Sequence, residues 1–143
     1  MLIKQLSIFT ENKPGGLAPI IETLGKNNID ISALSLADTS EYGILRLIVN
    51  DPDRAVSLLR EEGVIVKITD VLAIAMDDAP GGLSKVLDVF VKNDINLDYM
   101  YAFVGTVNKK ALTVVKVSDA VAASDALAKA GISTAEAKDI YRI

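Results

Sequence analysis

The stretch Pro14-Gly15-Gly16-Leu17 decides the fold, because it returns 66 residues later as Pro80-Gly81-Gly82-Leu83. The following chain repeats as well, since Lys26-Asn27-Asn28-Ile29 matches Lys92-Asn93-Asp94-Ile95 at the same offset. Similarity at one offset over a turn, a helix-length segment and a strand start indicates one small fold written twice. We therefore predict two domains, 1–70 and 71–143, since units of roughly 70 residues are large enough to fold.

Each copy carries the pattern of a ferredoxin-like unit. In the first copy, an apolar strand at 2–10 precedes the glycine turn, and an apolar helical stripe follows it. The order β-α-β-β-α-β is completed by two strands at 29–37 and 44–49, a helix that Asp51 caps and Gly63 ends, and a strand at 64–68. We predict an α+β fold class with two such units packed together, each with an antiparallel sheet and helices on one face.

The second copy follows without a linker, because the run 64–78 is nearly continuous in apolar residues. It predicts strands from Ile95 to Val104 and from Leu112 to Val117, a polar hairpin loop at 105–110, a helix capped by Ser118-Asp119, and a closing strand at 135–143.

Composition excludes several function classes. The chain of 143 residues has no Cys and no His, which removes disulfides, the usual zinc ligand sets and Ser-His-Asp catalysis. We expect no enzyme activity, no cofactor and no metal. A net charge of −4 argues against a nucleic-acid partner. No stretch approaches the ~20 apolar residues of a membrane span, and the polar start is unlike a signal peptide, so we expect a cytoplasmic protein.

The stretch Asn12-Lys13-Pro14-Gly15-Gly16-Leu17 after a first strand resembles the signature of the ACT domain, written Asn-x-Pro-Gly-x-Leu. ACT domains are small regulatory modules that bind amino acids, and the resemblance covers the whole chain as a tandem pair. It implies a ligand where the turn of one domain meets the second-strand start of its neighbour. The implied ligand-binding residues are Asn12, Lys13, Gly15, Gly16 and Leu17 with Asn96, and Asp78, Gly81, Gly82 and Leu83 with Asp30.

The chemistry of an amino acid suits such a turn. A helix N-terminus offers N–H groups and partial positive charge to a carboxylate, and the Asn12 amide can hold the ammonium group. The second copy has Asp78 in place of this Asn, and an aspartate would repel a ligand carboxylate. We therefore expect the better site at the first turn. Nearby acidic residues favour a neutral or basic free amino acid, such as histidine, serine or a branched-chain residue.

Other interpretations stay open. The glycines can simply let each helix pack close to its sheet, and Asp30 and Asn96 can cap or solvate strand starts. Tyr99, Tyr101 and Phe103 alternate on one face of a strand and can pack against another unit or chain. The leading hypothesis is an amino-acid sensor that changes its association with a metabolic enzyme, a regulator or a second copy in a homodimer. The alternative is a regulatory subunit of a metabolic enzyme that binds no small ligand.

Overall fold

The computed structural model describes residues 2–11, 13–38, 42–107 and 109–141. Contacts group these residues into two compact units, one of Lys4–Thr69 with residues 140–141 and one of Asp70–Asp139 with residues 2–3. We call them the first unit and the second unit. The architecture is α+β with antiparallel strand pairing, as predicted.

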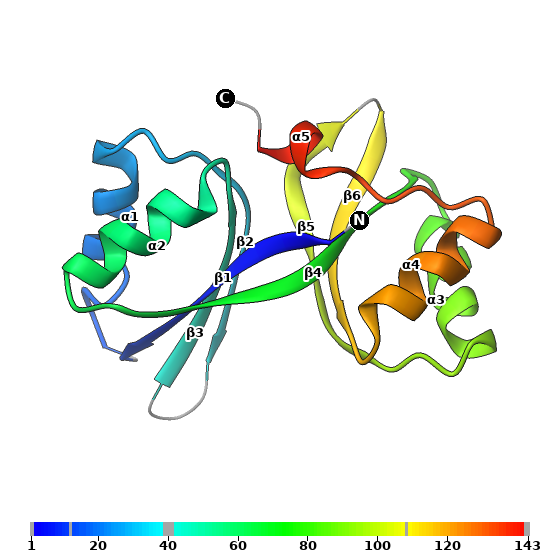
Figure 1. Ribbon diagram of the computed structural model, residues 1–143, viewed down its shortest axis with the longest axis horizontal. Coiled ribbons are helices and arrows are strands. Elements are labelled where there is room, and N and C mark those ends of the chain that lie inside the picture. The colour runs from blue at the N-terminus through cyan, green and yellow to red at the C-terminus, as the bar shows by residue number, and fades with distance from the viewer. Residues whose placement is uncertain (1, 12, 39–41, 108, 142–143) are drawn as a thin grey trace. The chain divides into compact units, whose positions relative to one another are not determined.

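The first unit follows the predicted order. Its β3 pairs antiparallel with both β1 and β2, and α1 and α2 lie together on one face of these strands (Figure 1). Apolar side chains of this face, including Leu6, Leu47 and Leu59, are fully buried between helices and strands. The elements are β1(Ile3–Glu11), α1(Ala18–Lys26), β2(Ile31–Asp38), β3(Tyr42–Val49), α2(Pro52–Glu61) and the start of β4(Ile65–Asp77).

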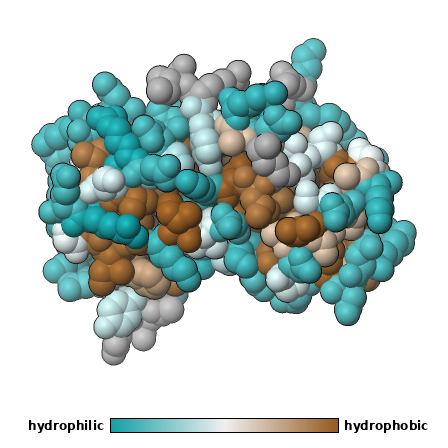
Figure 2. Space-filling view, in the orientation of Figure 1, coloured by the Kyte–Doolittle hydropathy of each residue, from teal (hydrophilic) through white to brown (hydrophobic). Residues whose placement is uncertain are grey.

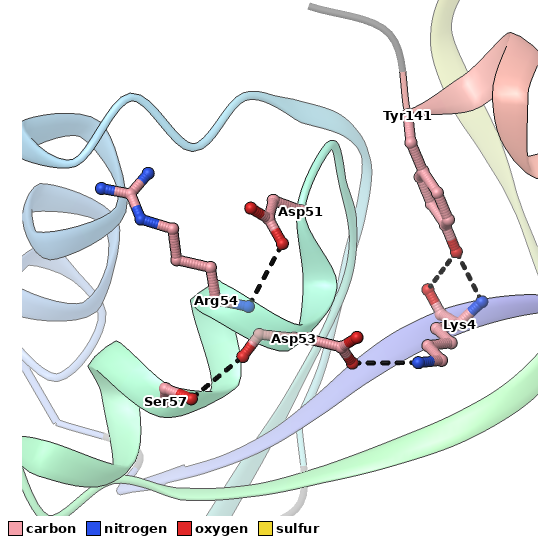
Figure 3. Close-up of polar contacts among 6 residues, drawn as sticks. All are labelled: Lys4, Asp51, Asp53, Arg54, Ser57 and Tyr141. Atoms are coloured by element: carbon pink, nitrogen blue, oxygen red, sulfur yellow. Dashed lines mark hydrogen bonds and ion pairs between the residues drawn. The ribbon is translucent and has the colours of Figure 1, made fainter.

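Helix α2 begins and ends as its sequence predicts. The Asp51 side chain accepts a hydrogen bond from the Arg54 backbone N–H at 3.3 Å (Figure 3). Pro52 occupies the first turn. Gly63 has a φ of +79° just beyond the last turn. A left-handed residue at that position ends a helix, so the chain turns directly into β4.

The C-terminal segment belongs to the first unit through Tyr141. Its hydroxyl accepts a hydrogen bond from the Lys4 backbone N–H at 2.7 Å and donates one to the Lys4 carbonyl at 3.3 Å (Figure 3). The Lys4 ammonium group contacts the Asp53 carboxylate at 2.9 Å. A single phenol thus satisfies both backbone groups of a β1 residue.

The second unit repeats the arrangement. Its β6 pairs antiparallel with both β4 and β5, and α3 and α4 pack on one side of them (Figure 1). The Asp119 side chain caps α4 by accepting from the Ala122 N–H at 3.0 Å, as predicted. The elements are the remainder of β4, α3(Gly82–Lys92), β5(Leu97–Val107), β6(Lys110–Val117), α4(Ala120–Lys129) and α5(Ala137–Ile140).

The predicted closing strand at 135–143 is wrong. In the described part of the C-terminal segment, which ends at residue 141, only residues 133–135 pair with β4, through the bonds Ala75 N–H to Ser133 O and Ala135 N–H to Ala73 O. The chain then forms α5. The stretch Ala135-Glu136-Ala137-Lys138 consists of strong helix formers, and local propensity decides where few tertiary contacts oppose it.

The predicted loop at 105–110 is also shorter than expected. Strand pairing continues to Val107 and Lys110, beyond a register irregularity between Ala102 and Thr106. Gly105 lies in this irregularity with a φ of +91°, which a bulge accommodates without ending the strand.

Among the described residues, no helix is long and apolar enough to cross a membrane.

Candidate functional site

The two glycine turns have the same backbone requirement. Gly15 and Gly81 have φ values of +79° and +86°, a region that side chains disfavour. In the next residue, a Cβ atom would lie 2.7 Å from the Glu11 carbonyl oxygen at Gly16 and 2.1 Å from the Asp77 carbonyl oxygen at Gly82. Two consecutive glycines therefore let each helix begin directly against the end of its preceding strand.

The helices begin at different points after these turns. The Lys85 N–H donates to the Gly81 carbonyl at 3.2 Å, and α3 begins at Gly82. The matching residue in the first unit is Pro19, which has no N–H to donate. The first helical hydrogen bond of α1 is therefore the one from the Ile21 N–H to the Leu17 carbonyl, and α1 begins only at Ala18.

Part of the backbone donor set is used inside the turns. The Gly16 N–H donates to the Lys13 carbonyl at 3.1 Å, and the Gly82 N–H donates to the Ala79 carbonyl at 3.0 Å. The geometry of an α-helix leaves the N–H groups of its first residues without an intrahelical acceptor. For an anionic ligand, the N–H groups of Leu17 and Ala18, and those of Leu83 and Ser84, are the donors that helix geometry provides.

The charges beside the turns differ. In the first unit, Lys13 contacts Glu11 at 2.8 Å, and this hydrogen bond lowers the pKa of the Glu11 carboxyl. In the second unit, Asp77 is held by Lys110, through a hydrogen bond, and by Lys85 at 3.7 Å. The hydrogen bond from Lys110, then the charges of Lys110 and Lys85, lower the pKa of Asp77. One carboxylate thus brings two ammonium groups together.

A cavity lies beside each turn and within its own unit. The first-unit cavity, about 580 Å³, is rich in exposed apolar side chains, with 45% of Phe9, 58% of Tyr42 and 68% of Ile65 accessible. Figure 2 shows apolar surface on this unit, at the left of the view. The charged residues that line the first-unit cavity are Glu11, Lys13 and Glu62. The second-unit cavity, about 470 Å³, is lined by the charged residues Asp77, Lys85, Lys110 and Asp139 and by Ser133 and Thr134.

Asp30 and Asn96 both lie at strand starts, far from the turn of their own unit. The Asp30 N–H donates to the Asn50 side chain at 2.9 Å, at the end of β3 opposite to the Glu11–Tyr42 pair. The Asn96 N–H donates to the Ser118 hydroxyl at 3.2 Å, and its amide donates to Asp98 at 3.0 Å. These bonds fit the interpretation of strand-start capping, and neither unit brings its own turn and strand start together.

The remaining predicted residues lie in the turns. Lys13 is exposed and paired with Glu11, and Leu17 is half-buried. Asp78 is exposed, and Leu83 is 39% exposed. Asn12 lies outside the described residues. The predicted combinations of the first turn with Asn96 and of the second turn with Asp30 stay predictions.

Sequence reasoning missed Lys85 and Lys110 as candidate ligand-binding residues. Lys110 reaches Asp77 because the two residues are opposite each other in the β4–β6 register. The equivalent partner of Glu11 is Tyr42. The one available signal was Lys85, which lies one helical turn after Gly81 and replaces Pro19. The prediction that Tyr99 and Tyr101 lie on one face of their strand is confirmed, since their rings stack with centroids 6.5 Å apart.

Comparisons with known proteins identify what the chain resembles. A family model described as an ACT domain pair matches residues 1–143. The crystal structure of protein BT0572 from Bacteroides thetaiotaomicron is 39% identical, with a TM-score of 0.93, 100% of this chain and 98% of that chain covered. A search of curated proteins finds no match to the sequence.

Two further solved structures share the fold at lower identity. The regulatory subunit of aspartate kinase from Thermus thermophilus, in a ligand-free form, has a TM-score of 0.62 at 14% identity, with 91% of this chain and 95% of that chain covered. Aspartate kinase from Synechocystis has a TM-score of 0.58 at 20% identity, covering 95% of this chain and 28% of that chain.

Proposed function

This chain belongs to the ACT domain family, as an ACT domain pair, and we propose that it binds a free amino acid at its first glycine turn and thereby modulates a partner or its own assembly. The ACT domain is a regulatory, amino-acid-binding family, and the match extends over both units. The observation that carries the proposal is the retained turn geometry, in which consecutive glycines place a helix N-terminus against a strand end.

The first turn suits an amino acid better than the second. A ligand carboxylate would accept from the N–H groups of Leu17 and Ala18 and gain from the partial positive charge of α1. The amide of Asn12 supplies both a donor and an acceptor, so it can contact either charged group of the ligand. Asp78 offers a carboxylate at the matching position of the second turn, and that group repels a ligand carboxylate.

Binding would act on a partner through differential stability. A ligand shifts an equilibrium between two states only by its difference in affinity for them. An amino acid held by the turn would stabilise the state in which the turn, α1 and β1 keep this geometry. A partner enzyme, a regulator or a second copy that prefers this state would then bind more tightly.

Thermal unfolding with each of the twenty amino acids tests the proposal. A ligand at a hundred times its dissociation constant stabilises the native state by about 2.7 kcal/mol, a shift that is easily measured. We expect one or a few amino acids to raise the melting temperature, and Asn12→Ala to reduce the shift by removing the contribution of the first turn. Asp78→Ala is the matched control, because it changes the corresponding residue of the other turn and should leave the shift intact.

A second function is favoured by one observation. Because the N–H groups of Gly16 and Gly82 already donate within their own turns, the glycines have a structural role that needs no ligand. On this alternative, the pair is a regulatory subunit of a metabolic enzyme and binds no small molecule. Melting curves that stay unchanged with all twenty amino acids at millimolar concentration would contradict the sensor and favour the subunit.

A further inference from the structure

The cavity of the second unit combines charge and space in one place. It encloses about 470 Å³, within the range of roughly 300–1,000 Å³ typical of small-molecule sites. The residues that line it include Lys85, Lys110, Asp77 and Asp139. Met76, Val86 and Leu112 are buried and give it an apolar floor. Such a cavity can hold a small molecule that has both charged groups and a short apolar part.

The two lysines are grouped around one carboxylate. Lys110 and Lys85 approach different oxygens of the same Asp77 carboxylate, so their positive charges are held close together. Each ammonium group has three N–H donors, and Asp77 accepts from only part of this set. Two cations around one anion leave a net positive charge in the immediate surroundings of Asp77, which favours a second carboxylate there.

The ion pairs with Asp77 leave both lysines accessible to a ligand. The side chains of Lys110 and Lys85 are 49% and 73% exposed. Exposed ion pairs contribute little to stability because water competes for both partners. A ligand carboxylate can therefore share the lysines with Asp77 at low cost, and Asp77 serves to position the two ammonium groups.

Asp139 supplies the complementary charge. With it, the charged side chains described on the cavity wall are two lysines and two aspartates, so the wall as a whole is neutral. A neutral wall with separated positive and negative groups fits a zwitterion better than a simple anion. The hydroxyl-bearing residues Ser133 and Thr134 lie on the same wall.

We propose that this cavity is a second ligand site, which binds a small zwitterionic amino acid with its carboxylate at Lys85 and Lys110 and its ammonium group at Asp139. The ligand class is the one of the proposed function, but the recognition differs, because lysine side chains replace a helix N-terminus and an asparagine. No residue of the first glycine turn takes part, so the two sites can fail separately.

NMR titration of the full chain with L-alanine tests the inference. We expect saturable amide shifts at Gly82 and at residues 133–135, and a rise in Kd of about tenfold or more in Lys110→Met and in Lys85→Met, because a hydrogen bond between charged groups is lost. Lys92→Met is the matched control for Lys85→Met, since Lys92 also lies in α3 but is not among the residues that line the cavity. Equal Kd values for the control and both cavity variants would overturn the inference.

Two analogues test the assignment of the charged groups. Lactate keeps the carboxylate and lacks the ammonium group, so it should bind more weakly than alanine and be insensitive to Asp139→Asn. Alaninamide lacks the carboxylate and should not shift the cavity amides. Binding of alaninamide as tight as that of alanine would overturn the carboxylate assignment.

The Asn12→Ala variant separates this inference from the proposed function. It should leave the L-alanine shifts at Gly82 and residues 133–135 unchanged. If Asn12→Ala abolishes amino-acid binding and the lysine variants do not affect it, the first-turn site stands and the second site is overturned. The reverse result would support the cavity and contradict the first-turn proposal.

Discussion

The two glycine turns share a backbone but have different surroundings. In both, a left-handed glycine precedes one that has no room for a Cβ atom. Around the first, the matching cavity positions hold Pro19 and Tyr42, and around the second they hold Lys85 and Lys110. The duplicated fold thus fixed the backbone of the site in both units and left the side chains that contact a ligand free to diverge.

Pro19 shows how one residue changes both structure and chemistry. It removes the N–H that would bond to Gly15, and α1 therefore starts later than α3. It also removes the cation that Lys85 supplies in the second unit. The first turn then has backbone donors and one lysine, Lys13, which is paired with Glu11, while the second has the two lysines Lys85 and Lys110 around Asp77. The two units can therefore recognise the same ligand class by different means.

The largest expected effect comes from adding a methyl group at the second glycine of each turn, where a backbone oxygen lies too close for it. Gly82→Ala places a methyl group 2.1 Å from a backbone oxygen, so the turn must shift, and we expect a loss of about 1–3 kcal/mol in the free energy of unfolding. In Gly16→Ala the new methyl group lies 2.7 Å from the Glu11 carbonyl oxygen, so the loss in the free energy of unfolding should be smaller. Denaturant unfolding of both variants measures the difference.

A glycine of the neighbouring helix provides the control for this pair. Gly25 lies within α1, and a Cβ atom there would have no neighbour within 4 Å. Gly25→Ala should therefore stabilise the protein by about 0.5–1 kcal/mol, because alanine favours the helix. A larger loss for Gly16→Ala than for Gly82→Ala would show that the first turn is the tighter one.

The helix caps should reveal where the units are alike. Asp51 and Asp119 cap α2 and α4 with hydrogen bonds of 3.3 Å and 3.0 Å. We expect Asp51→Ala and Asp119→Ala each to lower the free energy of unfolding by about 1 kcal/mol. Asp51→Asn and Asp119→Asn keep an acceptor and should recover most of that loss. A cap that costs nothing to remove would break the equivalence of the two units outside their turns.

Much of this arrangement could be predicted from the sequence, because local signals determine it. The repeated Pro-Gly-Gly-Leu turns, the caps Asp51 and Asp119 and the helix end at Gly63 each depend on a few adjacent residues. The helix in place of the closing strand was missed although its residues favour it, because the repeat predicted that the second copy would end like the first.

The charged cavity could not be predicted for a different reason. Lys110 and Asp77 are 33 residues apart and meet only through the register of β4 and β6. That register depends on where the β5–β6 hairpin turns, and the irregularity near Gly105 displaced the predicted loop. The lining of a site by residues from several strands therefore requires the pairing to be known residue by residue.

The smallest expected effect is the acid response of Asp77. The lysines lower its pKa in the folded state, so its carboxylate adds stability above the pKa of an unfolded aspartate, near 4. This contribution is lost as the pH falls through the folded pKa. The difference in melting temperature between wild type and Asp77→Asn should thus be constant from neutral pH to about pH 5 and should disappear as the pH falls through the lowered pKa of Asp77. Glu11→Gln is the matched control in the first unit, where one lysine lowers the pKa of Glu11. Since two cations act on Asp77, its difference should be the larger and should shrink more in ~1 M salt, which screens exposed charges that are more than about 3 Å apart. Equal pH profiles for the two variants would mean that Lys85 does not act on Asp77, and the second turn would then have only one cation for a ligand carboxylate.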